Sequence, residues 1–233
     1  MRKYLIGSIL LLLAMALVAC GDKDESESTD EMGDPMGEQV DISDEEKVDA
    51  DEVVAIVNDT EIIGSAYNTI YANLKVQSTQ MGDEFDTEEV KEATLESLID
   101  QELVRQEAES EGIEVSDEEL DEEISMIKEQ NEEGYETLLE QFQMTEDAFK
   151  DQLRIDLIRM EYADKKLDVD ISDDDVKKKY DELKGEVEEE EELPEFDEVK
   201  DQIKQSMEQE ELTLALDEKV EKLKETAKIE RKI

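Results

Sequence analysis

The hydrophobic positions of the chain form three zones that differ in spacing. An apolar run extends from Leu5 to Ala19, and residues 21–52 then hold fifteen acidic side chains, two lysines and no aromatic residue. From Val53 to the C-terminus, apolar residues recur at the spacing of short strands and amphipathic helices. The pattern predicts a leader over residues 1–19, an acidic disordered tether over residues 20–52 and one folded domain over residues 53–233.

The folded domain is expected to open with a small β-hairpin. Val53 to Val57 is β-branched and apolar, Asn58-Asp59 suits a turn, and the residues around Ile62 can return as a second strand. The C-terminal stretch "AKIERKI" alternates apolar and charged residues in the manner of an edge strand. We expect this last strand to pair with the hairpin.

Helices are predicted between the hairpin and the C-terminal strand. Gly112 is placed to end one of them, and Ser116 with Glu119 forms a capping box that begins the next. The expected helices begin near Ser65, before Leu95, at Ser116, at Thr145, at Ser172 (ending near Tyr180) and at Asp197 (ending near Thr226).

The helix that begins at Thr145 is apolar on two sides. One side carries Phe149, Leu153 and Met160, and the other carries Ile158 and Tyr162. Such a helix is either central to the fold or partly open to a partner, and the spacing alone leaves both alternatives standing.

Composition supports a mainly helical fold and restricts the function. The chain has 4% aromatic residues, two prolines and nine glycines in 233 residues, which favours long helices over a β-sandwich. Its 72 acidic and 25 basic residues give a formal charge of −47, so it cannot displace the counterions of a nucleic acid. The acidity is typical of a solvated surface that keeps a protein soluble, and we also hypothesise that it reflects a saline or alkaline medium.

The absence of histidine from the sequence excludes histidine-based catalysis and histidine metal sites. Asp168, Asp170 and Ser172 are spaced like the start of an EF-hand, but Asp173 and Lys179 stand where that loop needs glycine and glutamate. No metal and no cofactor are therefore expected.

The N-terminus combines Arg2 and Lys3 with an apolar segment that is short for a membrane span and suits a signal peptide. It ends in Leu17-Val18-Ala19-Cys20, which resembles a bacterial lipobox. The resemblance implies cleavage between Ala19 and Cys20 and a lipid on Cys20, the only cysteine of the chain. We expect a lipid-anchored protein on the extracytoplasmic face of the cell membrane.

Several stretches, in order, resemble the SurA N-terminal domain family. They are "VVAIVNDTEIIGSAYN", "LESLIDQELVRQEAESEGIEVSDEELDEEI", "YETLLEQFQMTEDAFKDQLRIDLIRMEYADKKL", "ISDDDVKKKYDELKG" and the segment from Phe196 to the C-terminus. Together they span residues 53–233. With the lipobox, the pattern is similar to PrsA-like foldase lipoproteins and, more distantly, to the chaperone part of trigger factor. The resemblance implies a mainly α chaperone domain and favours a Gram-positive cell.

In PrsA-like proteins a parvulin isomerase domain lies between the last two of these stretches. Here residues 185–193, with five consecutive glutamates, fill that interval. A segment so short cannot fold into an isomerase, and the parvulin site uses histidines that this chain lacks. The resemblance therefore implies a chaperone without prolyl isomerase activity.

What remains is a holdase that binds unfolded or secreted polypeptides. Methionine and aromatic side chains adapt to varied partners, and an acidic rim would favour basic ones. The client-binding candidates are Tyr67, Tyr71, Met126, Phe142, Met144, Phe149, Met160 and Tyr162. For each of them, ordinary core packing is the alternative.

Two other functions stay open at this point. One is a non-catalytic lipoprotein that binds one dedicated protein partner at the cell surface. The other is an enzyme with a paired-carboxylate site, because acidic residues are abundant in every part of the chain. The sequence does not indicate an oligomeric state or a client.

Overall fold

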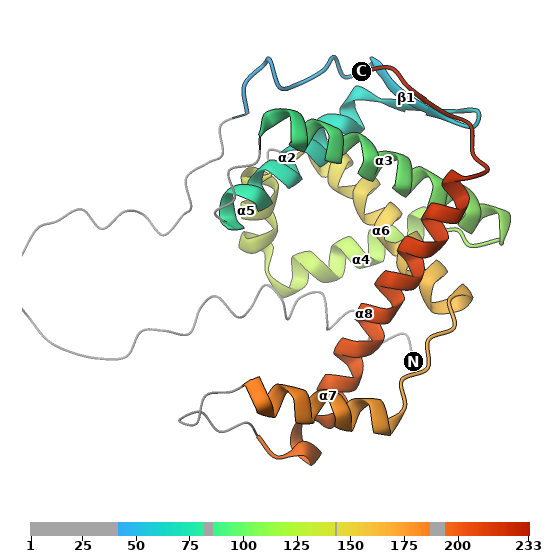
Figure 1. Cartoon of the computed structure of the whole chain (residues 1–233). Helices are drawn as coiled ribbons and strands as arrows, with labels where there is room; N and C mark the ends of the chain where they lie inside the picture. Colours follow the sequence, from blue (N-terminus) through green and yellow to red (C-terminus); the bar gives the residue numbers. More distant parts are fainter. Residues whose placement is uncertain (1–41, 82–85, 143, 187–193) are drawn as a thin grey trace, which may run out of the picture. The chain divides into compact units, whose positions relative to one another are not determined.

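The computed structural model describes residues 42–81, 86–142, 144–186 and 194–233 (Figure 1). Over these residues the chain forms seven helices and one three-stranded antiparallel sheet. The predicted mainly α fold with a small hairpin and a C-terminal strand is confirmed. The leader, with Ala19 and Cys20, and the tether up to residue 41 lie outside the described residues.

The sheet has the strand order β2-β1-β3. Strands β1 (Val53–Val57) and β2 (Thr60–Ile63) form the hairpin, and Asn58 adopts a positive φ of 56° in the turn between them. Strand β3 (Ile229–Arg231) pairs antiparallel with the other edge of β1, so that Figure 1 shows the C-terminus beside the hairpin. As the central strand, β1 is the most deeply buried of the three.

Local sequence signals explain most helix boundaries. Ser116 and Glu119 form the predicted capping box, and Thr145 accepts a hydrogen bond from the Ala148 N–H. Gly112 has the positive φ of 72° that suits a helix end. The helices are α2 (Gly64–Met81), α3 (Thr87–Ser110), α4 (Asp117–Gln130), α5 (Glu132–Gln141), α6 (Glu146–Lys166), α7 (Asp173–Glu186) and α8 (Phe196–Lys224).

Two helices differ from the sequence prediction. Helix α5 was not predicted, although Asn131 caps it by accepting a hydrogen bond from the Gly134 N–H at 2.9 Å. Helix α7 continues past Tyr180 to Glu186. Both differences concern short helices in strongly acidic stretches, where the apolar spacing carries little information.

The predicted boundary between tether and domain requires a correction, because residues 42–52 pack on the domain. Ile42 is 7% exposed and belongs to the core around the sheet. The Val48 N–H donates to Asn68 Oδ1 at 3.0 Å, and Asn68 Nδ2 donates to the Val48 carbonyl at 2.8 Å. Composition did not indicate these contacts, since two apolar residues and a few polar bonds suffice to hold the segment.

The buried side chains form three clusters. The first joins the sheet to α2 and α3, and the second joins the end of α3 to the C-terminal parts of α6 and α8. The third joins α7 to the N-terminal part of α8. Helix α8 therefore contributes buried residues to the second and third clusters and packs Leu223 against the first. Its end is held to α3 by ion pairs from Lys224 to Glu96 and, at 2.7 Å, to Asp100.

Candidate peptide-binding surfaces

Three of the eight predicted client-binding residues are core residues. Tyr67 and Tyr71 are each 1% exposed and stack with ring centroids 6.0 Å apart, and Tyr162 is 3% exposed. Side chains so deeply buried have no surface for a client, so these three positions are corrected to structural roles. The alternative of core packing holds for them because α2 and the second half of α6 are each covered by neighbouring elements.

A polar network locks the Tyr71 side chain in place. Its hydroxyl donates to Glu46 at 2.6 Å, and Lys75 donates to the same carboxylate oxygen at 2.8 Å. These two hydrogen bonds lower the pKa of Glu46 to about 2, and the bond from Lys75 has the larger effect. Burial raises the pKa of neighbouring Tyr67 to about 12. The network fastens residues 42–48 to α2 and is structural.

The other five candidates are half-buried and lie on consecutive elements. Met126 lies on α4, Phe142 and Met144 lie between α5 and α6, and Phe149 and Met160 lie on α6. Phe149, at the start of α6, contacts the Tyr135 ring of α5 edge to face at 5.2 Å. Helix α4 joins this group through ion pairs from Lys128 to Glu146, at 3.0 Å, and from Lys150 to Asp121. We call the half-buried apolar residues of this region the α6 face.

Helix α6 changes character along its length. Its buried residues, Ile158, Tyr162 and Ala163, all lie in its C-terminal half. Before them, Phe149 and Leu153 remain half-buried, and no residue of α6 preceding Leu157 belongs to the three clusters among the described residues. The second half of α6 is therefore central to the fold, and its first half is partly open. Both alternatives that the spacing left open apply, each to one half of the helix.

Two polar groups within this region are poorly compensated. The Tyr135 hydroxyl is buried and has no hydrogen-bond partner among the described residues. Asp156 on α6 accepts a hydrogen bond from Gln152 at 3.2 Å, and burial raises the pKa of its carboxyl group. Both groups therefore carry a desolvation cost that the contacts around them do not fully offset.

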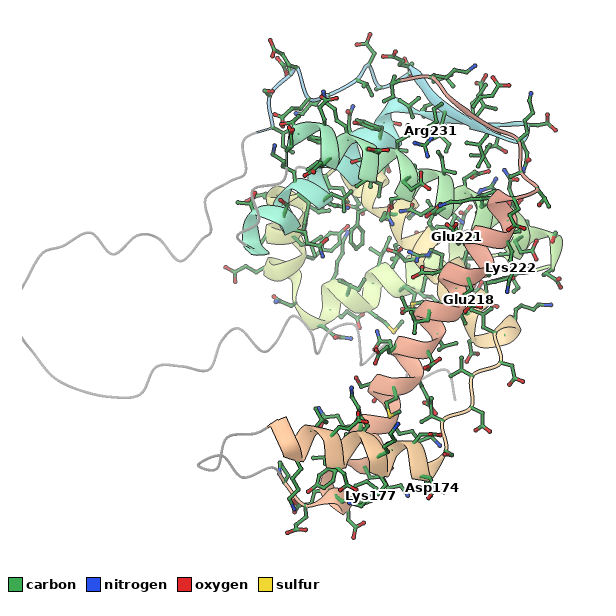
Figure 2. The ribbon with its side chains drawn as sticks, in the orientation of Figure 1. Asp174, Lys177, Glu218, Glu221, Lys222 and Arg231 are labelled. Atoms are coloured by element: carbon green, nitrogen blue, oxygen red, sulfur yellow. The ribbon has the colours of Figure 1, made fainter. Side chains whose placement is uncertain are left out.

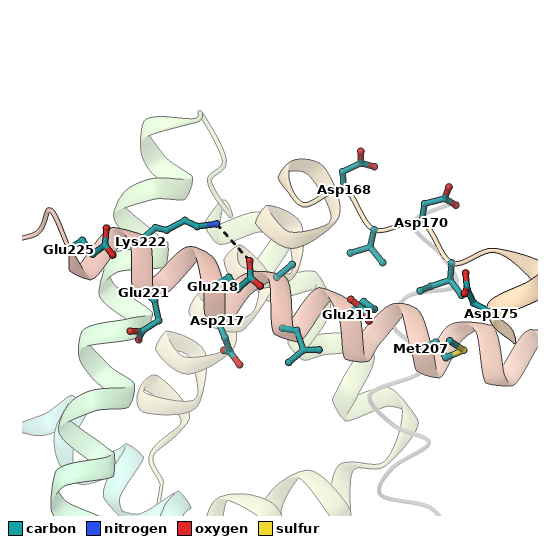
Figure 3. Close-up of a pocket in the computed structure, with 14 residues that line it drawn as sticks. Asp168, Asp170, Asp175, Met207, Glu211, Asp217, Glu218, Glu221, Lys222 and Glu225 are labelled. Carbon is teal, nitrogen blue, oxygen red and sulfur yellow. Dashed lines mark ion pairs between the residues drawn. The ribbon is translucent and has the colours of Figure 1, made fainter. Parts of the chain in front are cut away.

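A second surface, which sequence reasoning missed, is a groove of about 1070 Å³ along α8 (Figure 3). We call it the α8 groove. The linker between α6 and α7 and the start of α7 line one side, and α8 from Met207 to Lys222, with Glu225 just after the helix, lines the other. Its apolar residues include Leu214, which is 52% exposed. The signal in the sequence is that α8 carries two apolar stripes, more than a helix with one packed side needs.

Acidic side chains surround the apolar residues of the α8 groove. Figure 3 shows carboxylates from the linker and from α8 around it, and Figure 2 shows Glu218, Glu221 and Lys222 on α8. The lining contains eight acidic residues and one basic residue, Lys222, whose ammonium lies 3.7 Å from the Glu218 carboxylate. The groove can therefore hold an apolar group beside a positive charge.

Within the part of the chain that the structure describes, no three Asp, Glu, His or Cys side chains are arranged to hold a metal ion. In the same part, no helix combines the length and apolar character needed to cross a membrane. Burial raises the pKa of one further carboxyl group, Asp100, which forms the ion pair with Lys224 described above. Asp100 thus has a structural role at the end of α8.

Comparison with known proteins places these surfaces in a family context. The chain is 29% identical over 196 residues to the foldase protein PrsA of Caldanaerobacter subterraneus, covering 78% of this chain and 52% of PrsA. It is 38% identical over 85 residues to the chaperone SurA of Pseudoalteromonas translucida, covering 36% of this chain and 20% of SurA. The chain thus spans about half the length of this PrsA and a fifth of this SurA.

A solved structure also resembles the chain. It comes from work on the virulence factor PEB4 and the periplasmic protein Cj1289, two structurally related SurA-like chaperones of Campylobacter jejuni. The similarity has a TM-score of 0.48 at 15% sequence identity and covers 77% of this chain and 98% of the other.

The family model of the SurA-like N-terminal domain matches residues 2–163. The match contains the hairpin, α2 to α5 and nearly all of α6, and thus the whole α6 face. The resemblance to SurA and PrsA noted from the sequence is confirmed. The chain belongs to the family of SurA-like N-terminal domains, which it shares with PrsA-like foldases and SurA-like chaperones.

Proposed function

We propose that this protein is a membrane-anchored, extracytoplasmic holdase that binds unfolded or secreted polypeptides and has no prolyl isomerase activity. The observation that carries the proposal is the α6 face. Its methionine and aromatic side chains lie half-buried outside the three cores, on the domain that the family model matches. Such side chains bind varied apolar sequences because they repack at little cost.

The names of the relatives support a chaperone role. One is a foldase and one is a chaperone. The signal sequence and the lipobox cysteine, Cys20, support attachment to the outer face of the cytoplasmic membrane. The likeness to PrsA further favours a Gram-positive cell.

The contacts between α7 and α8 support the proposed lack of an isomerase domain. Tyr180 donates a hydrogen bond to the Pro194 carbonyl at 2.8 Å, and its ring meets Phe196 edge to face at 5.3 Å. The Lys177 ammonium lies over both rings, at 4.9 and 5.1 Å. These contacts hold the two helix ends together across the short glutamate-rich link, whose residues 187–193 lie outside the described part.

The first test is suppression of aggregation by residues 21–233 without lipid. Denatured clients of unrelated sequence are diluted into the protein at low and at high salt, and light scattering is followed. We expect less scattering for every client. No suppression at either salt contradicts the holdase, and an effect on one partner alone indicates a dedicated-partner lipoprotein instead.

A matched pair of variants assigns the activity to the α6 face. Met144→Ser with Phe149→Ser removes two half-buried apolar groups of that face. Ile63→Ser with Ile233→Ser removes two exposed ones elsewhere, 40% and 49% exposed. We expect the first pair to lose most of the suppression and the second pair to keep it. Equal loss in both pairs would show that general surface hydrophobicity is responsible.

A separate assay tests the proposed absence of catalysis. Isomerisation of a proline-containing tetrapeptide is followed with and without the protein. We expect the uncatalysed rate in both cases, and an acceleration that depends on protein concentration contradicts the proposal.

A further inference from the structure

The α8 groove contains an exposed leucine that packs into none of the described core clusters. Leu214 lies 52% exposed in the middle of α8, between the parts of the helix that pack into the second and third clusters. Val169 and Ile171 of the linker and Met207 of α8 line the same groove, where Ile171 is 7% exposed and all three pack into the third cluster. Leucine at this exposure, beside other apolar groups in a concave site, is typical of a surface that a partner covers.

The charges of the groove limit what that partner can be. Lys222, the basic residue in the lining, is already paired with Glu218. Asp168, Glu211 and Asp217 are exposed and have no cationic partner among the described residues. Three uncompensated carboxylates around an apolar floor attract a cationic ligand and repel an anionic one.

This charge argument disfavours two occupants that the chain could supply after the expected cleavage before Cys20. A second copy carries the same formal charge of −47. The chain's own N-terminal segment, residues 21–41, contains nine acidic residues and one lysine. Both would bring negative charge to the groove. A metal ion is not favoured either, because no three acidic side chains converge on one point among the described residues.

We propose that the α8 groove binds basic segments of polypeptide chains in which lysine or arginine alternates with apolar residues. The inference rests on the proposed holdase function, because it names the class of client segment that a site separate from the α6 face selects. The apolar side chains of the segment cover Leu214 and the half-buried Val169, and its cations meet Asp168, Glu211 and Asp217.

The length of the groove sets the length of the segment. The lining segment from Met207 in α8 to Glu225, the residue after the helix, extends about 27 Å at the rise of an α-helix. An extended peptide covers this distance with about eight residues. Successive side chains of such a peptide point to opposite sides, so alternating residues can reach the floor while the others meet the acidic rim.

The test uses the full chain in uncharged lipid nanodiscs and three short fluorescent peptides of equal length. The first combines lysine and leucine with serine spacers. The second carries glutamate in place of lysine, and the third carries serine in place of leucine. Anisotropy is measured against empty nanodiscs. We expect saturable binding of the first peptide, weakening as salt rises, and at least roughly tenfold weaker binding of the other two.

Two matched pairs of variants place the peptide in the groove. One triple variant removes three charges of the groove: Asp168→Asn, Glu211→Gln and Asp217→Asn. Its control removes three exposed charges elsewhere: Glu61→Gln, Glu114→Gln and Asp201→Asn. Leu214→Ser removes the floor, and Ile233→Ser removes an equally exposed apolar group outside the groove. We expect roughly tenfold weaker binding for each groove variant and unchanged binding for each control. All substituted side chains are exposed, and circular dichroism checks that the variants stay folded.

The outcomes separate this inference from the proposed function. Equal binding by the groove variants and their controls overturns the inference, and so does tight binding of the glutamate peptide. Self-association that Leu214→Ser abolishes also overturns it, because a second copy would then cover the groove. If aggregation suppression persists in any of these cases, the holdase function stands without the groove. Selective loss of binding to basic clients in the groove variants, with neutral clients still protected, supports both.

Discussion

Helix α2 and the first half of α6 carry similar side chains but bury them to different extents. On α2, Tyr67 and Tyr71 are each 1% exposed. On α6, Phe149 and Leu153 remain half-buried. The difference comes from what lies over each helix. The sheet, α3 and residues 42–48 cover α2, and α6 before Leu157 contributes to none of the described core clusters. Coverage by neighbours, and not residue type, separates a core helix from a binding surface.

The largest expected effect is on the core side of this comparison. Tyr67→Ala should lower the free energy of unfolding by about 3–5 kcal/mol, because it opens a cavity in a fully packed site. Phe149→Ala should lower it by only about 1–2 kcal/mol, since its ring is already partly exposed. Urea unfolding of both variants measures the two values. Equal losses would contradict the contrast between α2 and α6.

Removal of residues 42–52 tests the coverage of α2 directly. A chain that begins at Val53 lacks Ile42 and the hydrogen bonds of Glu46 and Val48. Its free energy of unfolding should be about 2–4 kcal/mol lower than that of a chain that begins at Ile42. The shortening should accelerate amide hydrogen exchange more in α2 than in α6. Unchanged stability of the shorter chain would restore the tether boundary predicted from composition.

Glu46→Gln should lower the free energy of unfolding by about 1–2 kcal/mol at neutral pH, because it weakens the hydrogen bonds that Lys75 and Tyr71 donate. The pKa of Glu46 is about 2 in the folded protein against 4.5 ordinarily, so its stabilisation is present above pH 4.5 and is lost as pH falls towards 2.

The difference in unfolding free energy between wild type and Glu46→Gln should therefore shrink over that range of pH. Comparison of the two proteins cancels the titration of the other carboxylates. A difference that stays constant down to pH 2 would show that Glu46 acts through packing and not through its charge.

The smallest expected effect is that of salt. The melting temperature should rise by a few degrees as NaCl increases towards molar concentrations, because salt screens the repulsion within a chain of charge −47. The ion pair of Glu46 and Lys75 is mostly buried, with side chains 14% and 22% exposed. Its contribution to the free energy of unfolding should therefore change little with salt concentration. Calorimetry in a salt series measures both, and a steady fall in melting temperature would contradict the idea of adaptation to a saline medium.

Local rules explain the elements that the sequence predicted correctly. The turn at Asn58, the helix end at Gly112 and the caps at Ser116 and Thr145 depend on residues within a few positions of one another. The pairing of the C-terminal strand with the hairpin spans the whole domain, but the alternation of apolar and charged residues in that strand already indicated an exposed edge.

The sequence by itself determined the mainly helical fold, the order of its elements and the family, because these follow from spacing, caps and the succession of motifs. Tertiary structure alone decided that Tyr67, Tyr71 and Tyr162 are covered, that Phe149 is half-open, and that an acidic groove forms beside Leu214. The physical reason is that exposure is a property of a residue's neighbours in space. Two apolar residues on similar helices differ only in what the rest of the chain places over them.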